Sequence, residues 1–176
     1  MLVDEAVTYL EMTSPDELVP GSSPPASVEM VRVDRTSVPL IRSTYARVGA
    51  PHDWISRQDW ADEAWEELLA RPSVSVWIAR LDDEVAGMVE LEARQGGDVE
   101  ITVFGLGPTF VGRGFGGHLL TLATRRAWET TSADGTPARR VWLHTSSHDH
   151  PHARLNYERR GFRPYRTEHR QREIPT

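Results

Sequence analysis

The sequence contains no cysteine and no lysine. The absence of cysteine excludes disulfide bonds, thiolate metal ligands and a cysteine nucleophile. Long apolar runs are also missing, and the N-terminal stretch "MLVDEAVTYLEM" carries acids where a secretory signal peptide needs basic residues. We therefore expect a soluble cytoplasmic protein with no membrane partner.

Positive charge is scarce and unevenly distributed. The net charge of −6 argues against nucleic acid as a main partner. Residues 138–176 hold nine arginines and four acids, whereas residues 1–137 hold 11 arginines and 22 acids. The basic C-terminal part is therefore suited to a polyanion, and the acidic part to a cation.

The 176 residues fit one domain with an appendage. Residues 13–27, "TSPDELVPGSSPPAS", contain four prolines and a glycine and are typical of a loop. We expect residues 1–27 to be an N-terminal extension and Pro-rich linker, with a short strand in "VTYLEM", and residues 28–176 to form the domain.

Apolar periodicity predicts the secondary structure of that domain. The predicted strands are residues 28–34, 73–81, 85–94, 98–106, 139–145 and 162–171, and the predicted helices are residues 38–49, 59–71, 114–130 and 150–161. A meander followed by a βαβ crossover indicates an α/β (α+β) fold, in which helices flank both faces of a mixed sheet.

The stretch "FVGRGFGGHLL", residues 110–120, places four glycines directly before a helical pattern. A glycine-rich turn between a strand and a helix binds anions, because the first helical N–H groups lack partners and glycines admit close approach. A P-loop is excluded because its lysine is missing. A Rossmann turn is excluded because three antiparallel-looking strands precede these glycines.

The stretch "DVEITVFGLGPTFVGRGFGGHLL", followed about forty residues later by "NYERRGF", resembles the GCN5-related N-acetyltransferase (GNAT) superfamily. The family motif Arg/Gln-x-x-Gly-x-Gly/Ala falls on residues 111–116, with Pro108 upstream. The family's later helix carries Asn, Tyr and Gly-Phe, where this chain has His150, Tyr157 and residues 161–162. Val111 and His150 depart from the usual Arg/Gln and Asn. The resemblance covers roughly residues 28–171.

The resemblance implies a GNAT-like, mostly antiparallel sheet with a V-shaped splay between residues 98–106 and 139–145. It implies acetyl-CoA as co-substrate, with the pyrophosphate on the N–H groups of residues 111–117 and the pantetheine arm along residues 104–106. A bulge at Gly105 is expected to open the splay. The implied cofactor-binding residues are Phe104, Gly105, Leu106, Val111, Gly112, Arg113, Gly114, Phe115, Gly116, Gly117 and His150.

Two residues are candidates for the proton transfers of acetyl transfer to an amine. Tyr157 occupies the position of the family's acid, which protonates the departing thiolate; a core aromatic is the alternative. Glu100 lies eleven residues before Val111, a spacing that matches the base of the histone-acetyltransferase branch. A solvent-facing strand glutamate is the alternative, with the proton passing to water.

The stretch "HDWISRQDWADEAWEE", residues 52–67, carries six acids and three tryptophans. Trp54 lies in the loop that frames the acceptor site in the superfamily, and the acids, Asp53 among them, would attract a cation. We expect a small cationic amine as substrate: an amino-acid-like metabolite, a polyamine or an aminoglycoside. A solvated acidic helix face is the alternative.

The stretch "HTSSHDHPH", residues 144–152, gathers four histidines and one aspartate, which suggests a metal site. Pro151 disturbs the ligand spacing and no acid follows at a suitable distance. We therefore expect a polar loop beside the cofactor and no metal.

These observations favour an acyltransferase that moves acetyl from acetyl-CoA to a primary amine directly, within a ternary complex. The alternatives are a protein N-terminal or lysine acetyltransferase, a non-catalytic acyl-CoA sensor module, and a regulatory protein-binding domain. The acceptor, the acyl chain length and the oligomeric state, including a homodimer, stay open.

Overall fold

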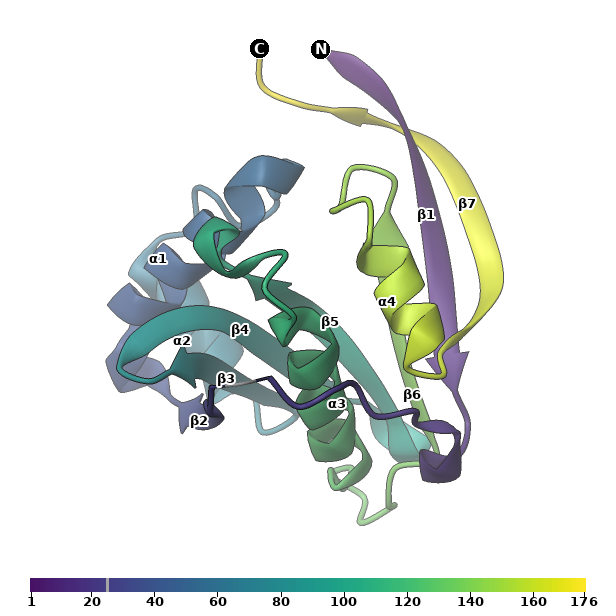
Figure 1. Ribbon diagram of the computed structural model, residues 1–176. Helices are drawn as coiled ribbons and strands as arrows, with labels where there is room; N and C mark the ends of the chain where they lie inside the picture. The colour runs from purple at the N-terminus through teal and green to yellow at the C-terminus, as the bar shows by residue number, and fades with distance from the viewer. Residues whose placement is uncertain (25) are drawn as a thin grey trace.

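A computed structural model describes residues 1–24 and 26–176; Pro25, in the expected Pro-rich loop, lies outside the described residues. Seven strands form one sheet in the order β2-β3-β4-β5-β6-β1-β7 (Figure 1). The strands are β1 (Leu2–Met12), β2 (Val28–Val33), β3 (Val74–Leu81), β4 (Glu84–Ala93), β5 (Asp98–Leu106), β6 (Arg140–Ser146) and β7 (Arg163–Glu173). The α-helices are α1 (Val38–Gly49), α2 (Asp62–Ala70), α3 (Phe115–Trp128) and α4 (Ala153–Arg159). The predicted fold class is confirmed.

Strand alternation builds a hydrophobic core on each face of the sheet. Met88 of β4 packs with Ile41 of α1 and Trp65 of α2, whereas its neighbour Val89 belongs to the cluster that contains Leu119 of α3. Successive strand residues point to opposite faces, so these two clusters lie on opposite sides. Helices α1 and α2 therefore cover one face and α3 covers the other.

The first strand, which lies in the expected N-terminal extension, belongs to the same sheet as the strands of residues 28–176. β1 pairs antiparallel with β6 on one side and with β7 on the other. Its residues Val7, Leu10 and Met12 are buried. The segment after β1 crosses α3, where Gly21 N donates to Thr121 Oγ1 over 2.8 Å (Figure 1). Proline content marked a loop correctly, but it carries no information on whether the preceding strand pairs with distant strands.

The predicted splay between β5 and β6 is present. The two strands pair in parallel only at their first residues, where Asp98, Val99 and Glu100 face Arg140, Val141 and Trp142. The bulge lies at Thr102 and not at Gly105, because Val103 pairs with Glu90 while Ile101 pairs with Leu91. Gly105 instead permits close packing of α1: a Cβ there would lie 2.4 Å from Val48 Cγ1.

In the part of the chain that the structure describes, no helix has the length and apolar character needed to span a membrane.

Candidate active site

Two cavities meet where β5 and β6 diverge. The first, called the slot, has a volume of about 250 Å³, and the second, called the side cavity, has a volume of about 260 Å³. Both cavities are lined by His52, Trp54, Phe104, Asp149 and Tyr157. A molecule in the slot can therefore meet a molecule in the side cavity at these residues.

The slot contains most of the predicted cofactor-binding residues. Seven of them line it: Phe104, Gly105, Leu106, Val111, Gly112, Gly116 and His150. Asn156 of α4, which the sequence pattern did not single out, also lines the slot. The other four, Arg113, Gly114, Phe115 and Gly117, are not among its lining residues. Of these, Phe115 is buried beside Phe110.

The glycine turn has the geometry of an anion cradle. Gly112 and Gly114 have φ values of +78° and +83°, which L side chains rarely adopt. A Cβ at either position would meet no described atom within 4 Å, so the backbone here faces open space. Gly114 is the N-cap of α3 and supplies no side chain to the first helical turn. The unpartnered N–H groups of that turn suit a phosphate.

Tyr157 lies at the junction of the two cavities. It is only 7% exposed and packs edge-on against Phe104, with ring centroids 6.1 Å apart. Burial, assisted by the negative charge of Asp149, raises the pKa of the Tyr157 phenol well above its ordinary value. The phenol therefore stays protonated at neutral and mildly alkaline pH, as a proton donor requires.

Trp54 and Asp149 bridge the opening between the two halves of the sheet. Trp54 Nε1, in the loop after α1, donates to Asp149 Oδ1, in the loop after β6, over 3.2 Å. Asp149 Oδ2 also accepts from Thr145 Oγ1 at 2.7 Å and from the backbone N–H of Ser146 at 2.8 Å. Trp54 was predicted at the site. Asp149 was not, because its role depends on the facing loop.

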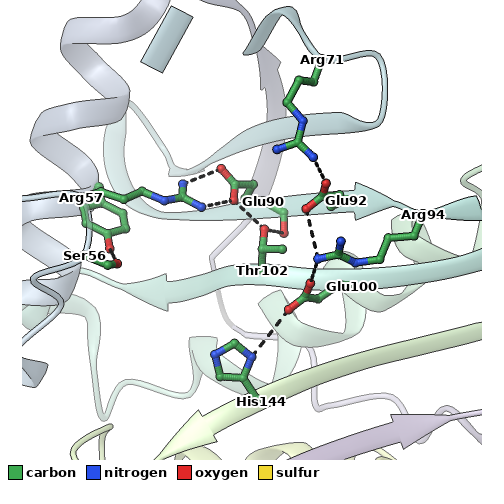
Figure 2. Close-up of polar contacts among 10 residues, drawn as sticks. Ser56, Arg57, Arg71, Glu90, Glu92, Arg94, Glu100, Thr102 and His144 are labelled. Atoms are coloured by element: carbon green, nitrogen blue, oxygen red, sulfur yellow. Dashed lines mark hydrogen bonds and ion pairs between the residues drawn. The ribbon is translucent and has the colours of Figure 1, made fainter. Parts of the chain in front are cut away.

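Glu100 does not reach either cavity. It is 4% exposed and lies at the level where β5 and β6 still pair. Its Oε2 is 2.6 Å from Arg94 Nη2, and its Oε1 is 3.6 Å from His144 Nδ1 (Figure 2). Burial raises the pKa of Glu100, but the contacts with His144 and Arg94 outweigh it and hold that pKa below its ordinary value. His144 lines the side cavity, so it lies between Glu100 and that cavity.

The acidic run at residues 53–67 does not surround the site. Asp53 is absent from the lining of both cavities. Its carbonyl oxygen accepts from Arg172 Nη1 at 3.0 Å, and its carboxylate oxygen Oδ2 lies 3.9 Å from His148 Nδ1. Asp62 pairs instead with Arg42 on α1. The other four acids, Asp59, Glu63, Glu66 and Glu67, likewise line neither cavity. The acidic helix face is therefore a solvated surface, because α2 turns its apolar side toward β3.

Three histidines stand beside the slot. The ring of His150 lies 6.1 Å from that of His52 and 5.4 Å from that of His152. Burial, followed by the charges of His152 and His52, lowers the pKa of His150, so its ring is neutral at pH 7. Over residues 1–24 and 26–176, no group of three or more His, Asp or Glu side chains is arranged to hold a metal ion.

Solved structures with the same fold differ widely from this chain in sequence. A functionally unknown conserved protein from Staphylococcus epidermidis is 15% identical with a TM-score of 0.69; the match covers 99% of this chain and 64% of that one. A GCN5-related N-acetyltransferase from Kribbella flavida is 19% identical with a TM-score of 0.63, with coverages of 99% and 60%. This chain thus spans less than two thirds of either. An aminoglycoside acetyltransferase from an uncultured soil metagenomic sample, in complex with sisomicin, is 14% identical with a TM-score of 0.59, with coverages of 75% and 86%.

At these identities the structural likeness establishes the fold alone. No curated protein matches the chain. The model of the acetyltransferase (GNAT) family matches residues 41–162, which include the glycine turn, Tyr157 and most of the slot. The chain therefore belongs to the acetyltransferase (GNAT) family, whose acetyl donor is acetyl-CoA.

Proposed function

We propose that this protein is an N-acetyltransferase that moves the acetyl group of acetyl-CoA to the primary amine of a small molecule. The observation that carries the proposal is the meeting of two cavities at Tyr157. A two-substrate transfer without a covalent enzyme intermediate needs such a junction, because donor and acceptor must be bound together. A side cavity of about 260 Å³ favours a small acceptor over a protein segment.

The residues of the slot fit acetyl-CoA. The N–H groups that follow Gly112 and Gly114 would hold the pyrophosphate, and the backbone of residues 104–106 would accompany the pantetheine arm like an added strand. His150, which replaces the family's asparagine, lines the slot and keeps a polar side chain there. The acetyl thioester supplies the activated carbonyl, and Tyr157 Oη would give its proton to the departing sulfur.

The proton of the acceptor amine would pass to His144 or to water held beside it. His144 lines the side cavity, whereas Glu100 is buried behind it with an Arg94 ion pair (Figure 2). We therefore assign Glu100 a positioning role: its carboxylate orients the imidazole and stabilises the imidazolium that forms. In this proposal His144 or water, and not Glu100, takes the proton directly from the amine.

Thiol release from acetyl-CoA, measured across amines, amino acids, polyamines, aminoglycosides and lysine peptides, tests the proposed function. Release that depends on a small amine supports it. Release only with peptides would instead favour a protein acetyltransferase. Acetyl-CoA binding without thiol release from any acceptor would favour the sensor alternative.

Gly114→Glu is expected to abolish acetyl-CoA binding at micromolar concentration in calorimetry, because the added carboxylate would meet the phosphates. Gly135→Glu is a matched control, since Gly135 has a φ of +84° and equally open surroundings but lies in the loop between α3 and β6, whereas Gly114 is the N-cap of α3. Both variants carry the same backbone strain. Equal acetyl-CoA affinity in the two folded variants would contradict the proposed phosphate site.

His144→Gln is expected to lower kcat at pH 7 by about 10² or more and to move the acidic limb of the kcat/KM profile to higher pH, where the free amine is already neutral. Glu100→Gln should lower kcat by a smaller factor, because the imidazole remains but loses the carboxylate that orients it and stabilises its protonated form. Wild-type profiles in both variants would show that neither residue participates in proton removal.

A further inference from the structure

The charged groups in the wall of the side cavity indicate what the acceptor carries besides its amine. Four such side chains line it: Glu5 of β1, Asp149, and Arg170 and Arg172 of β7. The strands β1 and β7 lie side by side in the sheet (Figure 1). A charged side chain can bind a ligand only through donors or acceptors that are not already hydrogen-bonded within the protein.

The two acids are already engaged by the protein. Glu5 is 2% exposed; its Oε1 accepts from Ser146 Oγ at 2.5 Å and its Oε2 from Arg170 Nε at 2.7 Å. Asp149 accepts from Trp54, Thr145 and the Ser146 backbone. An ammonium group could bind either carboxylate only by displacing these donors. The acids therefore organise the cavity rather than attract a polycation.

The two arginines retain donors. Arg172 Nη1 donates to the carbonyl of Asp53, but Nε and Nη2 are buried and have no hydrogen-bond partner in the described chain. Arg172 Nε is 3.5 Å from Glu5 Oε1, an ion-pair distance without hydrogen-bond geometry. Arg170 engages Glu5 through Nε, which leaves the two terminal nitrogens of its half-exposed side chain outside that ion pair.

From these contacts, and resting on the proposed function, we propose that the acceptor is an amine that also carries a carboxylate, as an amino acid does, and that Arg172 and Arg170 bind this carboxylate. A planar guanidinium with free donors matches a carboxylate in shape and charge. Glu5 holds the two guanidinium groups in place between β1 and β7. The amine then points to the junction, where Tyr157 lies, and His144 lines the same side cavity.

Kinetics on matched acceptors test this proposal with the full chain. Each amino acid is compared with its carboxamide and with the amine that lacks the carboxyl group, by thiol release. We expect kcat/KM for the carboxylate to exceed that for the carboxamide by about 10- to 100-fold. Arg172→Gln should remove this preference by lowering kcat/KM only for the carboxylate. Arg166→Gln is the matched control, because Arg166 is an exposed arginine of β7 that pairs with Glu168 and lines neither cavity.

Two outcomes would overturn the proposal. The first is a preferred acceptor that lacks a carboxylate, such as a polyamine. The second is an Arg172→Gln variant that loses activity equally on carboxylates and carboxamides, because Arg172 would then serve only to tie β7 to the Asp53 loop. Arg170→Gln provides the same comparison if Arg172→Gln does not fold.

A separate readout distinguishes this proposal from the proposed function. If no amine is acetylated, the thermal midpoint is measured with amino acids in the presence of coenzyme A. A rise in midpoint that Arg172→Gln removes and Arg166→Gln retains would support the carboxylate site although acetyl transfer had failed. If no amino acid raises the thermal midpoint, both the proposed function and the proposed carboxylate site are wrong.

Discussion

Replacing Tyr157 with phenylalanine is expected to lower kcat by about 10²- to 10⁴-fold, the usual contribution of a positioned proton donor. The change removes only the hydroxyl, so the ring keeps its packing against Phe104 and Phe162. The pKa of Tyr157 is raised by burial, so the wild-type rate should not fall through the loss of this proton at any pH below the ordinary tyrosine pKa. The KM for acetyl-CoA should change little, because the hydroxyl acts late in the transfer.

Steady-state kinetics over a pH series provide the measurement. Tyr165→Phe is the matched control, since Tyr165 is an exposed tyrosine of β7 that lines neither cavity. A wild-type kcat in Tyr157→Phe would leave Tyr157 as a packing residue and would assign thiolate protonation to solvent.

Glu90→Ala is expected to lower the free energy of unfolding by about 3 kcal/mol, because it leaves the largely buried guanidinium of Arg57, whose side chain is 16% exposed, without its counter-charge. Both carboxylate oxygens of Glu90 accept from Arg57, each at 2.8 Å, and Oε2 also accepts from Thr102 Oγ1 at 2.6 Å (Figure 2). Arg57 also stacks on Trp60, with its guanidinium carbon 4.9 Å from the ring centroid. The measurement is the urea concentration at the midpoint of unfolding. It reports the change in stability provided that the dependence of the unfolding free energy on urea, the m-value, is the same in the variant.

Asp62→Asn is the control for the Glu90 prediction, because the Asp62–Arg42 pair is exposed and should contribute at most about 1 kcal/mol. The double variant Glu90→Leu with Arg57→Met should recover much of the loss, since it leaves no unpaired charge. If Glu90→Ala lowers the free energy of unfolding as little as Asp62→Asn does, the prediction is wrong, and water solvates the Arg57 guanidinium once its partner is removed.

The Arg57–Glu90 pair also has a functional consequence. Arg57 belongs to the loop between α1 and α2 that carries Trp54 and Ser56, both of which line the side cavity. The ion pair anchors Arg57 on the interior strand β4 and so holds this loop against the side cavity. Variants of the pair should therefore raise the KM for the amine more than the KM for acetyl-CoA.

Local sequence signals were sufficient for much of the fold and the slot. Apolar periodicity located every α-helix and strand of residues 28–176 to within a few residues, because it reports which side of an element is buried. The glycine turn could be recognised in the sequence because its two features involve residues that are adjacent in the chain. These features are glycines that allow a positive φ and a helix start without a capping side chain. Tyr157 was singled out by the resemblance to the family's pattern of Asn, Tyr and Gly-Phe, which falls on His150, Tyr157 and residues 161–162.

The side cavity depended on contacts that no local pattern contains. Glu5 and Arg170 are separated by 165 positions and Trp54 and Asp149 by 95, yet each pair is hydrogen-bonded. Periodicity identifies a strand but not its partners, so the insertion of β1 between β6 and β7 could not be read from residues 1–12. The burial of Glu100 behind His144 likewise follows from where β5 and β6 separate. The sequence by itself therefore determined the family and the position of the glycine turn, whereas the order of strands in the sheet decided which charged side chains line the side cavity.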